Sequence, residues 1–223
     1  MRLEYRGYDS AGIAIQGPDG DLQRVRAAGK VSALAKKLPD EIKGSTGIAH
    51  TRWATHGAPT ETNAHPHKAG RIQLIHNGII ENFGDLRKEL KSKGCVFTSE
   101  TDSEVVAHLL DRSLELTSDP RQALIRTLKK LEGAFALAAI IERMPGLVLG
   151  ARRGAPLIAA FNDTVGFLAS DIMAITGEAH SMVYLEEGDA VLVRPGRLEL
   201  FDVDGQNIER SVVPAVESAL VAE

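Results

Sequence analysis

One cysteine, Cys95, stands in a chain of 223 residues, and no long uncharged apolar run occurs anywhere in it. A single cysteine excludes an internal disulfide and is typical of proteins that stay in a reducing compartment. No stretch reaches the roughly 18 apolar residues that a membrane-spanning helix needs. The first residues also lack the apolar core of a secretory signal. These absences predict a cytoplasmic protein that has no membrane partner.

The sequence also has fewer basic than acidic residues. The sequence has 26 Lys and Arg residues against 30 Asp and Glu residues, which gives a net charge of −4 with His neutral. A nucleic-acid-binding domain usually carries a dense basic run or patch, and this sequence shows none. Nucleic acid is therefore not an expected partner.

Short strands separated by turn residues fill both ends of the sequence. Two apolar runs flank the turn sequence GPDG at 17–20 and predict a hairpin. Six further runs after Leu147 have the regular spacing of antiparallel strands. The continuous apolar run at 134–141 predicts a strand that is buried on both faces. The pattern indicates one α+β domain with sheets inside and helices outside.

Three helices are expected between these two groups of strands. Asn82 is placed to begin the first, a capping box of Thr101 and Glu104 begins the second, and Asp119 followed by Pro120 begins the third. Each start signal precedes an apolar pattern of helical period. These signals predict where the three helices begin.

Three polar clusters lie at predicted strand ends or at a helix entry, at 52–57, 76–82 and 99–104. Each has an ordinary structural interpretation. Arg52 can form a surface ion pair, Asn77-Gly78 is a favoured turn dipeptide, and Asp102 suits a helix N-terminus. Their occurrence together in one domain favours a functional site.

Two other features suggest chemistry and also have structural interpretations. Five of the seven histidines lie between residues 50 and 76, namely His50, His56, His65, His67 and His76. Their spacing matches no structural zinc pattern and no cysteine accompanies them, so we expect histidines lining a pocket and no metal. Cys95 could be a nucleophile, but it is also a small apolar residue at the start of a predicted strand at 95–98.

The sequences of five motifs resemble those of a known family. They are LEYRGYDSAG (3–12), TGIAHTRWATHG (46–57), NAHPH (63–67), HNGIIEN (76–82) and SETDSE (99–104). Together these motifs resemble the glutaminase, or type 2 glutamine amidotransferase, domain of the glucosamine-6-phosphate synthases (glutamine–fructose-6-phosphate aminotransferases, isomerizing). The resemblance implies an N-terminal-nucleophile hydrolase fold, a four-layer α/β/β/α sandwich of antiparallel sheets. It implies no cofactor.

The resemblance also implies a domain organisation and partners. Residues 1–210 would form the amidotransferase domain, and residues 211–223 would be a linker toward a sugar-phosphate isomerase region. The substrate would be L-glutamine, whereas fructose 6-phosphate would bind only through the isomerase region. A homodimer would be expected of the full-length protein.

By the same resemblance, four residues would bind glutamine or stabilise its reaction. Arg52 would hold the α-carboxylate of glutamine, a role suited to a guanidinium. Asp102 would hold the α-ammonium. Asn77 and the backbone N–H of Gly78 would form the oxyanion hole for the tetrahedral intermediate.

Five further residues would surround the bound substrate. Thr55, His56 and Gly57 would belong to a loop that closes over glutamine. Trp53 would gate the path by which ammonia leaves, and Arg6 would lie near the start of the chain and help to position it.

The family's nucleophile is a cysteine at the mature N-terminus, whose own α-amino group serves as the base. The present sequence begins with Met1 in what resembles the end of the helix after that cysteine's strand. Three origins stay open: a fragment, a mis-set start and a degenerate paralogue. We expect the chain as given to be inactive in glutamine hydrolysis. The alternative functions are a catalytically dead glutamine-binding or regulatory module and a metal-dependent hydrolase that uses the histidines.

Overall fold

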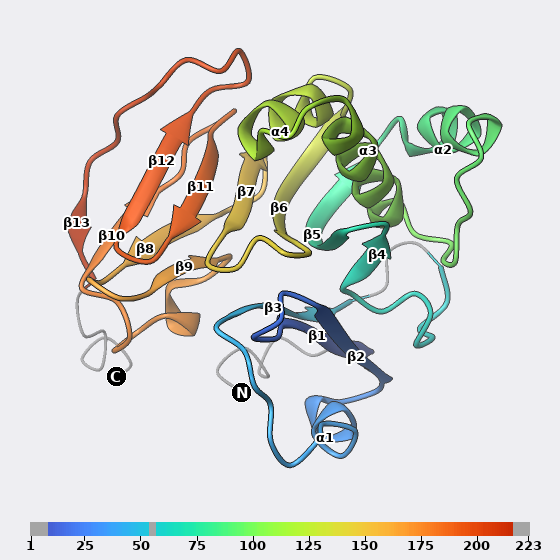
Figure 1. Ribbon diagram of the computed structural model, residues 1–223, viewed down its shortest axis with the longest axis horizontal. Coiled ribbons are helices and arrows are strands. Elements are labelled where there is room, and N and C mark those ends of the chain that lie inside the picture. The colour runs from blue at the N-terminus through green and yellow to red at the C-terminus, as the bar shows by residue number, and fades with distance from the viewer. Residues whose placement is uncertain (1–8, 54–56, 216–223) are drawn as a thin grey trace.

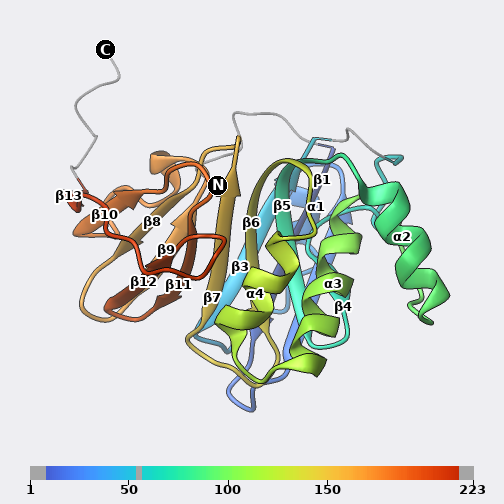
Figure 2. The same ribbon diagram turned by 90° about the horizontal axis from the view of Figure 1, so that it is seen from above.

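The largest β-sheet carries helices on one face and two smaller sheets on the other (Figures 1 and 2). The computed structural model describes residues 9–53 and 57–215. The large sheet has six antiparallel strands in the order β12-β11-β7-β6-β5-β4. Their bounds are β4 (His67–Ala69), β5 (Ile72–Ile80), β6 (Gly133–Ile141), β7 (Val148–Arg153), β11 (Ala190–Arg194) and β12 (Arg197–Phe201).

Three helices cover the outer face of this sheet: α2 (Phe83–Ser92), α3 (Ser103–Leu116) and α4 (Pro120–Leu128). The largest apolar core lies between them and the sheet, and it includes Leu74, Leu110 and Leu149, which are almost fully buried. Burying each such side chain stabilises the fold by about 1.5–3 kcal/mol. This core holds α3 rigidly against β5, the two elements that border the site described below.

Strand β6 is buried on both faces, as the run at 134–141 predicts. Its odd-numbered residues, such as Leu137, pack under the helices, and its even-numbered residues, such as Ala138, pack against the smaller sheets. Side chains alternate between the two faces of a strand, so a continuous apolar sequence fits only the middle of a layered fold.

A three-stranded sheet in the order β2-β1-β3 packs on the other face of the large sheet. Ala14 and Ile48 contact Ala138 and Ile140 across the two sheets. The outer face of the small sheet is covered by helix α1 through Leu34. The bounds are β1 (Ser10–Gln16), β2 (Leu22–Ala28), β3 (Thr46–Arg52) and α1 (Val31–Ala35). The layers therefore run helices, sheet, sheet, helix, which confirms the predicted α+β four-layer sandwich.

A four-stranded sheet in the order β13-β10-β8-β9 packs beside the three-stranded sheet. Leu168 of β9 belongs to the same apolar cluster as Ile48 of β3, so both small sheets lie on one face of the large sheet. Their bounds are β8 (Ile158–Phe161), β9 (Gly166–Ala169), β10 (Ser181–Tyr184) and β13 (Val213–Pro214), with a short 3-10 helix, η2 (Ile172–Ala174), after β9.

The three helices begin where the sequence predicts, but the side chains of Asn82 and Glu104 make other contacts than the predicted caps. Asp119 accepts the N–H of Arg121, as a cap should. Asn82 lies at the start of α2 without capping it, and its side chain binds the backbone of Lys130 and Glu132. These contacts tie α2 to the segment that leads into β6.

The expected capping box at α3 forms only in part. Thr101 Oγ1 accepts the N–H of Glu104 at 3.4 Å, but the Glu104 carboxylate binds the N–H groups of Thr98 and Ser99. Residues 95–98 form no strand, so the predicted strand at Cys95 is wrong, and Thr98 at its end binds this carboxylate instead. Hydrogen bonds of a buried carboxylate outweigh the β-propensity of the short sequence CVFT.

The C-terminal part of the described chain stays on the four-stranded sheet. Val213 and Pro214 pair with β10, and the N–H of Ala215 binds the carbonyl of His180. The sheet thus continues beyond residue 210, the predicted boundary of the domain. Within the described residues, no helix combines the length and apolar character that crossing a membrane requires.

Candidate active site

A cavity of about 990 Å³ lies where the two small sheets meet the large one. Residues of β3, β5 and β9 line it, together with the start of α3. Among the described residues, β3 pairs only with β1 and β9 pairs only with β8. Two unpaired strand edges therefore border a single cavity, which holds Arg52, Asn77, Gly78 and Asp102.

Strand alternation places two neighbouring polar residues of β5 on opposite faces of the sheet. His76 points toward α3, where its Nδ1 lies 2.9 Å from Ser103 Oγ. Asn77 points toward β3, where its Oδ1 lies 2.8 Å from His50 Nε2. Because side chains alternate along a strand, only Asn77 of this pair points into the space between the sheets, whereas His76 lines the cavity beside Ser103 at the start of α3.

Gly78 has a backbone that requires glycine. Its φ is +121°, and a Cβ added there would lie 2.1 Å from the carbonyl oxygen of Ala134 on β6. A side chain would therefore clash with the neighbouring strand and strain the backbone. Glycine here lets β5 deviate from regular strand geometry directly beside Asn77.

Asp102 is a buried carboxylate at the N-terminus of α3. Its Oδ2 accepts the N–H of Ile80 at 2.9 Å, and its Oδ1 accepts the hydroxyl of Ser103 at 3.3 Å. The start of a helix favours negative charge, because its free N–H groups and its dipole are positive. These interactions stabilise a carboxylate that lines the cavity.

Arg52 ends strand β3, and its side chain is only 5% exposed. The guanidinium lies 3.8 Å from Asp9 and donates to the carbonyl oxygens of Gly57 and Ala58 at 3.3 and 3.4 Å. Burial lowers the pKa of Arg52, whereas the carboxylates of Asp9 and Asp102 raise it. The cavity thus contains a buried cation near a buried anion.

The segment after residue 56 is held by Asn63, which is buried. Its Nδ2 donates to the carbonyl of Ala58 at 3.0 Å and to Glu100 Oε2 at 3.1 Å, and its Oδ1 accepts the N–H of Glu100. Gly57 has a φ of +77°, and an added Cβ would lie 2.7 Å from the Asn63 amide. Asn63 therefore positions the two carbonyls that receive Arg52.

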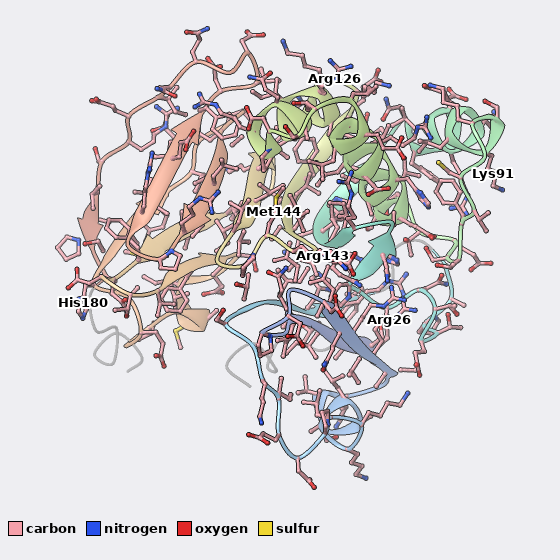
Figure 3. All side chains as sticks on the ribbon, viewed as in Figure 1. Arg26, Lys91, Arg126, Arg143, Met144 and His180 are labelled. Atoms are coloured by element: carbon pink, nitrogen blue, oxygen red, sulfur yellow. The ribbon has the colours of Figure 1, made fainter. Side chains whose placement is uncertain are left out.

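A second arginine supports the same loop from β2. Arg26, labelled in Figure 3, donates from Nη1 to the carbonyls of Thr62 and Ala64 at 2.9 and 2.8 Å. These bonds hold the chain just before the cis peptide between His65 and Pro66. The loop that carries Asn63 is thus fixed to the three-stranded sheet.

Three histidine rings pack together beside Asn77. The rings of His50 and His65 stack with centroids 4.2 Å apart, and the ring of His67 meets that of His65 edge-on at 4.7 Å. Burial lowers the pKa of His50 to about 4, although its hydrogen bond to Asn77 raises it. Burial also lowers the pKa of His65, and it lowers that of His67 to about 3. All three rings are therefore neutral at neutral pH.

The predicted site residues divide into three groups. Arg52, Asn77, Gly78 and Asp102 line the cavity together with Trp53, whose surface is 70% exposed. Gly57 is linked to this group through its carbonyl. Thr55, His56 and Arg6 lie outside the described residues.

The two alternative chemistries receive no support from the described residues. Cys95 packs against the helix-covered core beside Leu90 and is not among the residues that line the cavity. Within the described ranges, no three His, Cys, Asp or Glu side chains are grouped as metal ligands would be. The polar cavity formed by β3, β5 and α3 therefore remains as the candidate active site.

Sequence reasoning assigned no role to Asn63 or Ser103, and it expected His50 and His65 only as histidines that line a pocket, which they do. Their contacts join residues far apart in the chain, such as Asn63 and Glu100 or His50 and Asn77. The crowding of histidines indicated a pocket lining, but it did not show that His50 stacks on His65 and binds Asn77.

Comparisons with known proteins bear on this cavity. A sequence profile described as a glutamine amidotransferase domain matches residues 50–177. The glutamine–fructose-6-phosphate aminotransferase (isomerizing) of Gluconobacter oxydans is 53% identical over 95% of this chain and 35% of its own length. That of Zymomonas mobilis is 51% identical over all of this chain and 37% of its own length. The chain spans about a third of these relatives.

Solved structures show the same fold. The glutamine phosphoribosylpyrophosphate amidotransferase from B. subtilis, complexed with ADP and GMP, aligns with a TM-score of 0.76 and 24% identity over 91% of this chain and 44% of its own. A glutamine aminotransferase class-II domain protein from Silicibacter pomeroyi aligns with a TM-score of 0.58 and 18% identity, over 87% and 91%. At such identities the likeness concerns the fold alone.

Proposed function

The chain belongs to the glutamine amidotransferase family, and from this premise we propose that it is the glutamine-hydrolysing domain of a glutamine–fructose-6-phosphate aminotransferase. In that role it supplies ammonia for the synthesis of glucosamine 6-phosphate. Its fold is that of the N-terminal-nucleophile hydrolases. The observation that carries the proposal is that Arg52, Asp102, Asn77 and Gly78 line one cavity.

The first part of the proposal concerns the two charges of the amino-acid head. Free glutamine carries an α-carboxylate and an α-ammonium, and the cavity offers a buried guanidinium and a buried carboxylate. Arg52 binds the α-carboxylate and Asp102 binds the α-ammonium. Both protein groups are already desolvated and held by neighbours such as Asp9 and Ile80, so binding requires little further ordering of side chains.

The second part concerns the side-chain amide. Attack by a thiolate on the γ-carbonyl carbon forms a C–S bond and moves the carbonyl electron pair onto oxygen. The Nδ2–H of Asn77 and the backbone N–H of Gly78 stabilise that oxyanion. The α-amino group that took the thiol proton passes it to the nitrogen, and collapse of the intermediate breaks the C–N bond, so that the nitrogen leaves as ammonia. Water then hydrolyses the thioester to glutamate.

The thiolate itself comes from a cysteine at the N-terminus of the family's mature domain. Cys95, the one cysteine of the sequence, lies in the helix-covered core instead. We therefore propose that the 223-residue chain binds glutamine but hydrolyses it only when an N-terminal cysteine segment is joined to it. Thr55, His56 and Gly57 form the loop over the substrate, Trp53 gates the exit of ammonia, and Arg6 positions the start of the domain.

The proposal extends to the rest of the protein. The relatives are about three times as long as this chain. In the full-length protein a sugar-phosphate isomerase region accompanies this domain, binds fructose 6-phosphate and forms the homodimer of a cytoplasmic enzyme.

A second candidate function is a glutamine-binding module without catalysis. It is favoured by the absence of any thiol among the described residues that line the cavity. Calorimetry with L-glutamine and an ammonia assay separate the two functions. Binding that is followed by hydrolysis once the cysteine segment is joined supports the enzyme. Binding without hydrolysis in both forms supports the module, and no binding in either form refutes both.

A further inference from the structure

His50 makes a hydrogen bond whose direction is fixed by chemistry. Its Nε2 lies 2.8 Å from Oδ1 of Asn77, across the space between the two facing sheets. An amide oxygen only accepts hydrogen bonds, so the imidazole nitrogen donates. The His50 ring therefore carries a proton on Nε2.

This bond also fixes the orientation of the Asn77 amide. With Oδ1 held by His50, the Nδ2 group is the part of the side chain left to face the cavity that Asn77 lines. Among the described residues, no hydrogen bond uses this Nδ2. Turning the amide over would make its NH₂ group the donor and place the His50 proton on Nδ1, which is enclosed and has no acceptor among the described residues. A buried donor without an acceptor is destabilising, so this arrangement is disfavoured.

The neighbouring rings hold His50 in place. His65 stacks on it with an interplanar angle of 17°. His65 is itself fixed at both nitrogens, because Nδ1 accepts the N–H of His76 at 3.1 Å and Nε2 lies 3.3 Å from Ser103 Oγ. The Nδ1 of His50 is enclosed and has no hydrogen-bond partner among the described residues, which suits an unprotonated nitrogen. A neutral ring with its proton on Nε2 meets all of these contacts.

We propose that His50 is a positioning residue of this site, which orients the Asn77 amide so that its Nδ2–H points to the place where an oxyanion forms. The inference rests on the proposed function, because the oxyanion is that of glutamine hydrolysis. His50 contacts neither substrate nor reacting atoms in this account. It acts through Asn77 alone.

The hydrogen bond is tested in the chain as it is, without substrate. NMR of chain labelled with ¹⁵N in its imidazole rings distinguishes the two neutral tautomers and the charged form at pH 7. We expect neutral His50 with the proton on Nε2. A proton on Nδ1, or a charged ring, overturns the proposal, and neither result depends on whether the chain hydrolyses glutamine.

The effect on catalysis is tested in the chain joined to the N-terminal cysteine segment of the Gluconobacter relative. His50→Ala should lower kcat for glutamine hydrolysis about 10- to 100-fold with little change in KM, less than the 10²–10³-fold loss expected when the donor itself is removed. His50→Gln, whose Nε2 can still donate to Asn77, should recover most of that loss. His67→Gln is the matched control, because His67 packs edge-on against His65 but contacts Thr101.

A double mutant separates positioning from general damage to the fold. If His50 acts through Asn77, adding His50→Ala to Asn77→Ala lowers kcat no further. Additive losses, a change in KM alone, or no recovery by His50→Gln each overturn the proposal. If neither the joined chain nor any of its variants hydrolyses glutamine while the NMR result holds, the proposed function is refuted. The hydrogen bond between His50 and Asn77 then exists but has no catalytic role.

Discussion

The carboxylate of Asp102 accepts the backbone N–H of Ile80 at 2.9 Å, which joins the first turn of α3 to the last residue of β5. This bond places the carboxylate and the Asn77–Gly78 pair in fixed relation, because both depend on the same strand. The two parts of the proposed chemistry, holding the amino-acid head and stabilising an oxyanion, are thereby built on one rigid unit.

Replacement of Asp102 should weaken glutamine binding. Removing one member of a buried charge pair typically costs about 2–5 kcal/mol, so Asp102→Ala should raise the Kd for glutamine about 30-fold or more. Isothermal titration calorimetry of the 223-residue chain measures this change. Asp111→Ala is the control, since Asp111 binds the N–H of Arg71 and does not line the cavity. Equal affinities of wild type and Asp102→Ala would remove Asp102 from this role.

Gly78→Ala should destabilise the fold. The new methyl group would meet the Ala134 carbonyl at 2.1 Å on a backbone with φ of +121°, so β5 and β6 would have to separate there. We expect a loss of more than about 2 kcal/mol in the free energy of unfolding, measured by urea denaturation.

The matched control is Gly84→Ala in α2, where nothing lies within 4 Å of the added carbon. Alanine in an exposed helix is favoured over glycine, so this variant should gain up to about 1 kcal/mol. If the two substitutions change stability alike, the close approach of β5 and β6 at Gly78 is incorrect.

Acid should destabilise the protein before its carboxylates titrate. Burial lowers the pKa of His67 to about 3, whereas an unfolded histidine titrates near 6.5. Between these values the unfolded chain binds more protons than the folded chain, so stability is full above about pH 6.5 and falls as the pH drops. Each such histidine contributes up to about 1.4 kcal/mol per pH unit within this window.

Urea denaturation at pH 7 and pH 5 measures this loss. The difference between the two pH values should shrink in His67→Gln, which removes a buried imidazole. Titration of the Glu104 carboxylate does not contribute to the difference in stability between pH 7 and pH 5. Burial raises its pKa, but the neighbouring His108 and hydrogen bonds from Ser99 and Thr98 hold it below the ordinary range, so its own contribution is lost only below about pH 4.3. An unchanged difference in His67→Gln would show that His67 is charged in the folded chain.

The chain as given should release no ammonia from glutamine above background. Joining an N-terminal segment that begins with a processed cysteine should switch hydrolysis on, because a thiolate, a base and the oxyanion hole then meet in the cavity. Coupled-enzyme detection of ammonia measures both forms. Cys95→Ser should change neither, since Cys95 packs against the helix-covered core. Steady release by the unmodified chain that Cys95→Ser abolishes would make Cys95 the nucleophile.

Features that depend on neighbours along the chain could be predicted from the sequence alone. Asp119 with Pro120 began α4, the apolar run at 134–141 became the doubly buried β6, and the turn at 17–20 closed a hairpin. A helix cap involves residues within one turn, and strand burial follows from a pattern of period two. The motif wording also indicated the family that the profile then matched.

Contacts between distant residues depend on which faces of the sheets and helices pack together, and these could be seen only in the folded structure. The motif carrying Asn77 and Gly78 was visible in the sequence, but the partner of Asn77 is His50, 27 residues away on a facing sheet. The Glu104 carboxylate accepts the N–H groups of Thr98 and Ser99 where the sequence predicted a capping box. The strand predicted at Cys95 does not form beside it. Contacts of this kind are set by the register of strands and the packing of layers, and a local pattern carries no information about either.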